Sequence, residues 1–239
     1  MIISKVTLRT DELAFVLTSP SDLMEITTDY ERKVIEYIVS SLQEGGVFID
    51  VGAHIGVYSL RIARLFPKAN IVSIEPNPIA FEALILGIKA NNLYNVNALN
   101  LALSDIDGEV TLHVKLINAA SSIIETQGSL KSIKVKAMRL DTLVETLKLN
   151  RIDVIKVDVE GAKLEVLRGA INTLKNYKPK IIAEVRKRNM ELFLNIISTL
   201  GYTCKVIEEK EIDAHIFCYS ATPSIIDQHG RRIGYPHLR

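Results

Sequence analysis

Short runs of β-branched and apolar residues alternate along the chain with longer stretches in which apolar residues recur at helical spacing. The alternation begins at residue 47 and is typical of βαβ units around a mostly parallel sheet. Five of the runs are almost continuously apolar, as expected for parallel strands that are buried on both faces. These predicted strands cover residues 47–51, 70–75, 96–103, 154–158 and 180–185.

Helical periodicity predicts four helices within this alternation. Pro78 stands where a helix accepts proline in its first turn, and Gly201 follows an apolar helix as a candidate C-terminal cap. The predicted helices cover residues 57–66, 78–90, 164–174 and 190–200.

The first part of the chain lies outside the βαβ pattern. Residues 2–18 predict a β-hairpin, and residues 30–42 predict an amphipathic helix that begins after Thr28 or Asp29 as its cap. We interpret residues 1–45 as a hairpin and helix that cover the open side of the sheet.

The remaining chain divides into a main domain, residues 46–221, and a C-terminal tail, residues 222–239. Within the main domain, residues 109–114 and 133–137 alternate apolar and polar positions and predict an inserted antiparallel pair. The tail either folds over a neighbouring surface or forms a loosely ordered terminus.

The last two predicted strands, residues 202–207 and 214–219, flank an acidic turn and should pair antiparallel. This pairing places Cys204 roughly opposite Cys218. A cross-strand disulfide is one interpretation, but the favoured one is two small buried hydrophobic side chains in an intracellular protein.

Composition narrows the function classes. Hydrophobic residues make up 48% of the chain, charged residues 24%, and the formal net charge is +1, which argues against disorder and against a polybasic nucleic-acid binder. The chain contains two cysteines and no clustered histidines, so no zinc site is predicted. The start lacks the apolar run of a secretory signal, and no stretch approaches the ~20 apolar residues of a membrane span, so we predict a cytoplasmic protein with no membrane partner.

Acidic residues stand at or just after the end of every predicted parallel strand. The carboxyl ends of parallel strands meet at one edge of the sheet, where open α/β proteins bind their ligands. Carboxylates that converge there repel one another unless a cation or hydroxyl donors satisfy them. The residues are Asp50, Glu75, Asp105, Asp158 and Glu184.

The turn after the first strand, residues 50–56, carries Gly52 and Gly56. Glycines let the backbone turn tightly and approach a ligand, and the following helix N-terminus offers N–H groups to an anion. The spacing is not the GxGxxG of a dinucleotide site. It suits a ligand with a carboxylate beside the N–H groups and a positive centre near Asp50, as in the amino-acid half of S-adenosylmethionine.

Three further positions are candidates for the nucleoside half of such a ligand. Glu75 can accept hydrogen bonds from both ribose hydroxyls. Ser104 and Asp105 either contact adenine or form an ordinary turn. His54 either contacts the cofactor or caps the following helix.

These residues resemble the FkbM-type methyltransferases, a family of class I S-adenosylmethionine enzymes, over about residues 30–206. The resemblance implies S-adenosylmethionine as cofactor and a three-layer Rossmann-like α/β fold, with a seven-stranded, mostly parallel sheet and an antiparallel last strand. It also implies Pro76 and Asn77 beside Glu75 at the cofactor, and methyl transfer to oxygen, often on sugars or small metabolites. The motifs lie at residues 48–56, 74–78, 102–105, 155–162 and 165–170.

Methyl transfer depends mainly on holding donor and acceptor in line, and a carboxylate can help by taking the hydroxyl proton. Our hypothesis is that Asp158 contacts the cofactor and faces the acceptor as this base, with Glu184 in support. Glu160 either orients the acceptor or is a carboxylate favoured by a helix start. No metal is predicted, because no histidine accompanies Asp158 and Glu184.

Positive charge gathers near the predicted acceptor side. Lys163 and Arg186 stand where this family commonly has an acid and a histidine. The basic run 186–188 either draws an anionic or sugar-containing acceptor or forms a solvated loop.

Two other functions share the predicted cofactor site. An RNA methyltransferase would need a nucleic-acid surface, for which the sequence shows neither a motif nor a basic excess. A non-catalytic module would bind S-adenosylmethionine without turning over an acceptor. A nicotinamide-dependent oxidoreductase is disfavoured because GxGxxG is missing from the first turn.

Overall fold

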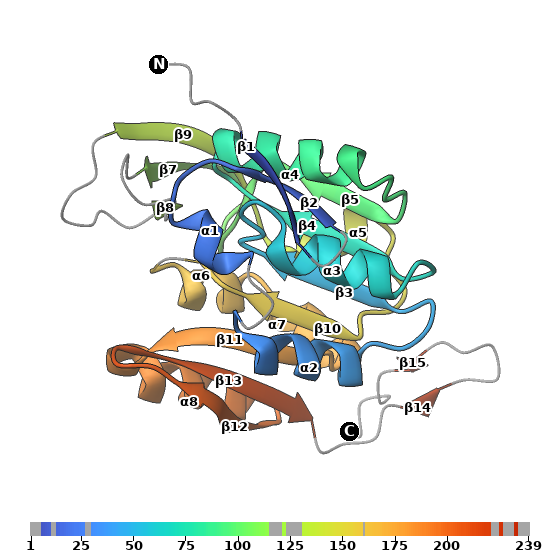
Figure 1. Cartoon of the computed structure of the whole chain (residues 1–239). Coiled ribbons are helices and arrows are strands. Elements are labelled where there is room, and N and C mark those ends of the chain that lie inside the picture. The colour runs from blue at the N-terminus through green and yellow to red at the C-terminus, as the bar shows by residue number, and fades with distance from the viewer. Residues whose placement is uncertain are drawn as a thin grey trace.

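A seven-stranded sheet forms the centre of the protein (Figure 1). The computed structural model describes residues 6–10, 13–26, 30–114, 121–122, 131–159, 161–220, 225–226 and 232–233. The strands follow the order β12-β13-β11-β10-β3-β4-β5. They are β3 (Val47–Val51), β4 (Asn70–Ile74), β5 (Val96–Leu99), β10 (Val154–Val157), β11 (Lys180–Arg186), β12 (Tyr202–Glu209) and β13 (Asp213–Ser220).

The ladder between β5 and β11 is parallel throughout, and β13 runs antiparallel to both β11 and β12. This arrangement confirms the predicted Rossmann-like α/β fold with antiparallel last strands. The order reverses beside β3, so the loops after β3 and β10 lie at the point where open sheets bind ligands.

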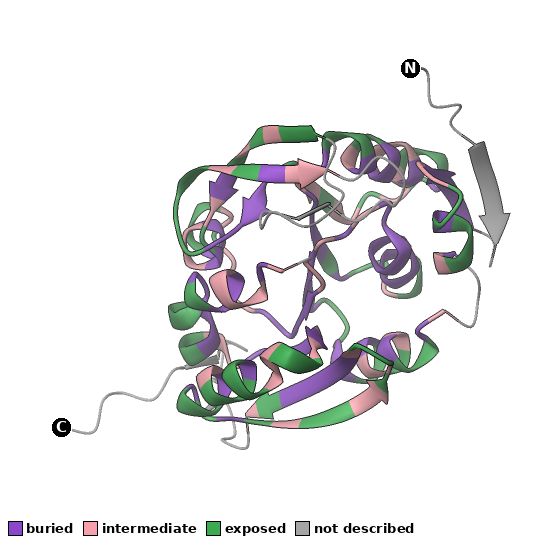
Figure 2. Ribbon diagram, turned by 90° about the vertical axis from the view of Figure 1, so that its left-hand side faces the viewer, coloured by how far each residue is buried: buried purple, intermediate pink, exposed green. Residues whose placement is uncertain are grey.

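Helices cover both faces of the sheet. One face packs against α2 (Arg32–Ser41), α3 (Val57–Leu65) and α4 (Pro78–Ala90). The other packs against α5 (Leu140–Thr146), α6 (Lys163–Arg168), α7 (Ile171–Tyr177) and α8 (Met190–Thr199). Neighbouring strand residues point to opposite faces, so Phe48 joins the first core and Ile49 the second. In Figure 2 the central strands are mostly buried and the outer sides of the helices exposed.

Local signals placed several helix ends correctly. Pro78 is the first residue of α4, and the Asn77 side chain caps that helix by accepting a hydrogen bond from the Ile79 N–H at 3.0 Å. Gly201 follows α8 with a φ of 79°, as a C-terminal cap requires.

The single helix predicted over residues 164–174 is wrong, because the chain forms α6 and α7 with Gly169 between them. A Cβ at Gly169 would lie 2.0 Å from the Ser104 carbonyl oxygen. The backbone of this junction therefore packs directly on the loop after residue 103, and a continuous helix would not fit.

The strand predicted over residues 96–103 is also wrong in part, because it divides between two sheets. After β5 the Asn100 side chain donates to the carbonyl oxygens of Glu75 at 2.8 Å and Pro76 at 3.2 Å and turns the chain. The chain continues as β6 (Ala102–Leu103) in a separate four-stranded sheet. Here β7 (Gly108–Val114) pairs antiparallel with β9 (Lys131–Met138), which confirms the predicted insertion, and with β8 (Ser121–Ser122).

The predicted N-terminal hairpin is present as β1 (Val6–Thr10) and β2 (Leu13–Leu17). The Asn91 side chain holds β2 against the end of α4 through two 2.8 Å hydrogen bonds to the backbone of Ala14. The helix predicted over residues 30–42 is α2, which begins at Arg32 after Glu31, while the proposed caps Thr28 and Asp29 lie outside the described residues.

Three short elements were not predicted: α1 (Asp22–Glu25), the 3₁₀ helix η1 (Lys187–Asn189), and a ladder of β14 (Ile225–Ile226) with β15 (Arg232–Ile233). The rest of the predicted tail lies outside the described residues. No described helix is long and apolar enough to cross a bilayer.

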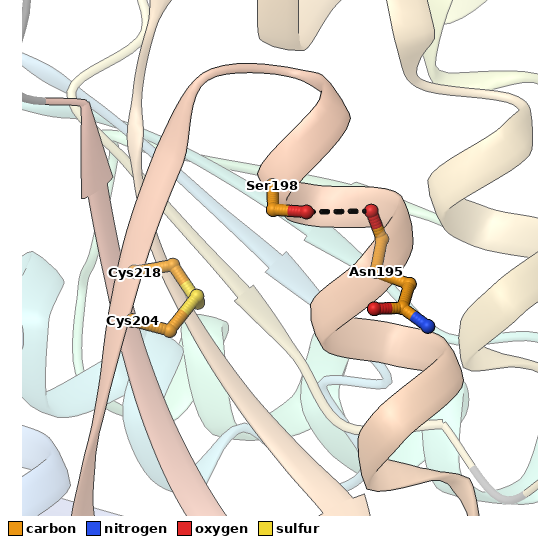
Figure 3. The surroundings of a disulfide bond; sticks show 4 residues. All are labelled: Asn195, Ser198, Cys204 and Cys218. Carbon is orange, nitrogen blue, oxygen red and sulfur yellow. Dashed lines mark hydrogen bonds between the residues drawn. A yellow bond between two sulfur atoms is a disulfide. The ribbon is translucent and has the colours of Figure 1, made fainter.

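Cys204 and Cys218 form a disulfide, so the favoured prediction of two unlinked side chains is wrong. The register of β12 and β13 places the two residues directly opposite each other. Figure 3 shows the bond beside α8, which carries Asn195 and Ser198. Cys218 is fully buried, and both residues belong to the core beneath α8.

Candidate active site

A cavity of about 360 Å³ opens at the carboxyl ends of β3, β4, β10 and β11. Short segments before α2 and in the second sheet complete its walls, including Tyr30 and Leu112. The predicted site residues in the lining are Gly52, His54, Glu75, Pro76, Asp158 and Glu184. Those outside it are Asp50, Gly56, Asn77, Ser104 and Asp105.

The two glycines after β3 serve different contacts. Gly52 has a φ of 81°, and a Cβ there would lie 2.0 Å from the Asp158 carbonyl oxygen, so the loop packs directly on the end of β10. Gly56 has a φ of 93°, and its missing side chain leaves room for Leu84 of α4. Gly52 thus shapes the cavity, whereas Gly56 lets α3 pack against its neighbour.

Glu75 is held in one orientation by the backbone. One carboxylate oxygen accepts the His54 N–H at 2.9 Å, and the other accepts the Asn77 N–H at 2.8 Å. Burial raises the pKa of Glu75, and the positive charge of His54 and these N–H groups partly offset that rise. A carboxylate offers about four acceptor positions, so two remain for the hydroxyls of a ligand.

Asp50 lies beneath the cavity and is fully buried. Its Oδ2 accepts the Ser59 hydroxyl at 2.6 Å, and Ser59 in turn accepts the Ser73 hydroxyl at 2.6 Å. Its Oδ1 receives no hydrogen bond from the described residues. Burial raises the pKa of Asp50, and Lys156 acts against that rise.

Lys156, which the sequence analysis missed, lies in the cavity wall between two of the predicted acids. Its Nζ is 3.1 Å from Asp158 Oδ2, 4.0 Å from Asp50 Oδ1 and 4.1 Å from the centre of the Tyr58 ring. Burial disfavours the ammonium ion, but Asp158 and Asp50 more than compensate and raise the pKa of Lys156. The predicted negative edge therefore contains its own cation. A lysine two residues before a strand-end acid, on the same side of the strand, was the available signal.

A second ion cluster lies beyond Asp158. Lys210 Nζ donates to Glu31 Oε1 at 2.6 Å and to Glu184 Oε1 at 3.1 Å. Buried His215 lies with its Nε2 3.4 Å from Glu31 Oε2, and the Tyr58 hydroxyl also donates to Glu31. Glu31, Glu184 and His215 are close enough to surround a cation, and the Lys210 ammonium supplies one.

Asp158 and Glu184 meet across the cavity wall, where their carboxyl groups are hydrogen-bonded. Burial works against ionisation of Asp158, but Lys156 and Lys163 hold its pKa well below the usual range. Burial and the neighbouring Asp158 raise the pKa of Glu184. Of the two, Glu184 thus has the affinity for protons that a base needs at neutral pH.

His54 binds neighbouring segments through both its backbone and its ring. Its Nδ1 is 3.2 Å from Glu25 Oε2 on α1, and its Nε2 is 3.9 Å from Asp22 Oδ1. Burial opposes the charged ring, but Glu25, Glu75 and Asp22 raise the pKa of His54 to about 9. The N-cap of α3 is Gly56, with no side-chain cap, so the His54 ring does not cap that helix.

Ser104 and Asp105 form a turn beside the cavity. The Ser104 hydroxyl donates to Asp105 Oδ1 at 3.2 Å, and Asp105 is exposed. The next acid, Asp107, accepts the Arg139 Nε–H at 2.7 Å. Leu103, not these polar residues, lines the cavity.

Two other predicted groups lie away from the described cavity. Glu160 lies outside the described residues. The basic run 186–188 is absent from the cavity lining, and Lys187 forms an exposed ion pair of 2.8 Å with Glu209 on β12.

The strand order and the position of the cavity define a Rossmann-like protein with the architecture of methyltransferases. The fold is similar to that of the methyltransferase FkbM from Methylobacillus flagellatus, with a TM-score of 0.54 and 16% identity over 77% of this chain and 50% of that chain. A model of the methyltransferase FkbM domain matches residues 50–209. The chain therefore belongs to the FkbM methyltransferase family, as its motifs predicted.

Curated relatives are similar over part of their length. The chain is 33% identical over 147 residues to the hexuronic acid methyltransferase AglP of Haloferax volcanii, covering 61% of this chain and 59% of the relative. It is 28% identical over 159 residues to the 2-O-methyltransferase NoeI of Sinorhizobium fredii, covering 59% of this chain and 65% of the relative. The chain thus spans less than two thirds of the length of both relatives.

Proposed function

We propose that this protein uses S-adenosylmethionine to methylate a hydroxyl group on a sugar or another small metabolite. The observation that carries the proposal is Glu75, a buried carboxylate held by two backbone N–H groups at the cavity, with acceptor positions left over for a ribose diol. Family membership and the cavity at the strand ends support the same cofactor.

The residues present suit the parts of such a cofactor. Glu75 would hold the ribose hydroxyls, and Leu103 and Pro76 would flank the adenine. The loop at Gly52 and His54 would receive the amino-acid end. When bound, the cofactor supplies an electrophilic methyl group on a positively charged sulfur, and the acidic wall at Asp158 favours that charge.

An oxygen acceptor on a sugar is supported by the names of the relatives, one acting on a hexuronic acid and one a 2-O-methyltransferase. The protein's own contribution to such a reaction is to hold both reactants in line inside the cavity, which can lower the barrier by several kcal/mol. Asp158 and Glu184 lie on the wall where the acceptor hydroxyl would approach.

Calorimetric titration with S-adenosylhomocysteine tests the cofactor directly. We expect the protein to bind it and Glu75→Gln to weaken binding by roughly tenfold to a hundredfold, the cost of charge-assisted hydrogen bonds. Glu191→Gln, at an exposed position on α8 outside the cavity lining, is the matched control and should bind normally. Failure of the unmodified protein to bind would refute the proposal.

A screen of acceptors with a labelled methyl donor tests the reaction. Neutral sugars, uronic acids, phenols and RNA form the panel. We expect label on a sugar or small hydroxyl compound, and label on RNA alone would favour the alternative RNA methyltransferase.

A further inference from the structure

Two carboxyl groups share a hydrogen bond in the wall of the cavity. Asp158 follows β10 and Glu184 lies on β11, the neighbouring parallel strand. Two ionised carboxylates cannot form this bond, since neither has a proton to donate. The geometry therefore requires one proton for the pair.

The charges that face the pair come from every element around it. Lys156 on β10 bonds Asp158, and Lys163 on α6 acts on both acids. Lys210, after β12, bonds Glu184, and His215 on β13 lies 3.9 Å from Glu184 Oε1. On the side of α2, Glu31 and the hydroxyl of Tyr30 face the same cluster.

These cations are shared among more acids than the pair alone. Lys156 also faces Asp50, and Lys210 makes its shorter bond, 2.6 Å, to Glu31. The two lysines are thus divided between the pair and two other buried acids. A further positive charge in the cavity would meet carboxyl groups that the protein has only partly neutralised.

Resting on the function proposed above, we propose that Asp158 and Glu184 share one proton in the free protein and that the sulfonium charge of the methyl donor displaces it. Glu184 is then ionised only when the donor is bound. The opposite displacements of the two pKa values, lowered for Asp158 and raised for Glu184, agree with a proton that resides on Glu184.

This exchange of a proton for a cation prepares the base for catalysis. As the acceptor oxygen forms its bond to the methyl carbon, the carbon–sulfur bond breaks and its electron pair stays on sulfur. The hydroxyl proton passes to Glu184. The sulfur is then neutral and the carboxyl pair again holds one proton, so the charge in the cavity is the same before and after transfer.

The test is to count protons released on binding. S-adenosylmethionine and S-adenosylhomocysteine are titrated calorimetrically in buffers of different ionisation enthalpy, between about pH 5 and about pH 8. The two ligands differ only in the methyl group and its charge, so protons released by their shared parts cancel. We expect the methionine form to release up to about one proton more than the homocysteine form.

Two variants assign the proton. Glu184→Gln should bind both ligands and abolish the difference in proton release. Asp213→Asn, which removes another carboxyl of the cavity lining, should keep it. Melting curves confirm that each variant is folded, and the comparison of ligands on the unmodified protein decides the matter if one is not.

The outcomes separate this inference from the proposed function. Binding of both ligands with equal proton release at every pH overturns the shared proton and leaves the methyltransferase proposal standing. Loss of the difference in Asp213→Asn overturns the assignment to Asp158 and Glu184. Binding of neither ligand overturns the proposed function and this inference with it.

Discussion

At the scale of single residues, the ammonium group of Lys156 lies inside the protein because two carboxylates hold it there. Its side chain is 3% exposed, and removing one member of a buried ion cluster leaves an uncompensated charge. Asp158 and Asp50 were predicted from the sequence as a negative edge awaiting a cationic ligand. The structure shows that part of their charge is already balanced from within.

Lys156→Met should therefore destabilise the protein at neutral pH. We expect the free energy of unfolding to fall by about 3 kcal/mol, with a smaller deficit near about pH 4, where the carboxyl groups take up protons. Urea unfolding at both pH values measures this. Lys163→Met, at a half-buried lysine, is the control and should cost less. Equal losses for the two variants would contradict a special role for Lys156.

At the scale of elements, the short helix α1 is held over the cavity by polar contacts rather than by a broad apolar face. Asp22 Oδ2 accepts the backbone N–H groups of Thr18 at 2.6 Å and Ser19 at 3.0 Å. Glu25 pairs with His54 in the loop after β3. A helix of four residues has too few positions for helical periodicity, so its sequence did not predict it.

The link between α1 and His54 should depend on pH. The pKa of His54 is about 9 in the folded protein and about 6.5 in an unfolded chain, so the folded state holds the proton more tightly. The stabilisation is complete below about pH 6.5 and is lost as pH rises through about 9, up to about 3 kcal/mol.

His54→Asn measures this contribution, because asparagine tolerates the left-handed backbone at this position, where φ is 51°. We expect the variant to be less stable than the unmodified protein at about pH 6 and nearly equal to it at about pH 10. A difference in unfolding free energy that does not change with pH would show that His54 is uncharged in the folded protein.

At the scale of the whole molecule, the disulfide closes the antiparallel edge of the sheet. It joins residues 14 apart in sequence on β12 and β13. The same pair of strands carries Lys210 and His215 at the other end of their ladder, beside Glu184. The bond thus constrains the unfolded chain and stabilises the edge from which the second ion cluster projects.

Removing this cross-link should lower global stability more than it disturbs the cavity. For a loop of this length we expect Cys204→Ala with Cys218→Ala to cost about 3 kcal/mol. Thermal melting of the unmodified protein with a reductant should match the double variant, and thiol titration verifies the oxidised form. A melting temperature that is unaffected by both treatments would argue against the cross-link.

The sequence by itself determined the parallel strands, their flanking helices and the edge at which the acids gather. These follow from local rules, since buried parallel strands must be apolar and ligands bind at their carboxyl ends. It also carried the family motifs. Helix 164–174 and strand 96–103 could not be divided from sequence alone, because a backbone contact at Gly169 and the side chain of Asn100 interrupt them.

Only the tertiary structure decided which acids reach the cavity and what balances them. Glu75, Asp158 and Glu184 line it, whereas Asp50 lies beneath it. The cations Lys156 and Lys210 reach these acids from β10 and from the turn after β12, and Lys210 is 179 residues away from Glu31 in sequence. Charge compensation in a buried cluster depends on distances between segments that are remote along the chain, and a linear pattern does not record those distances.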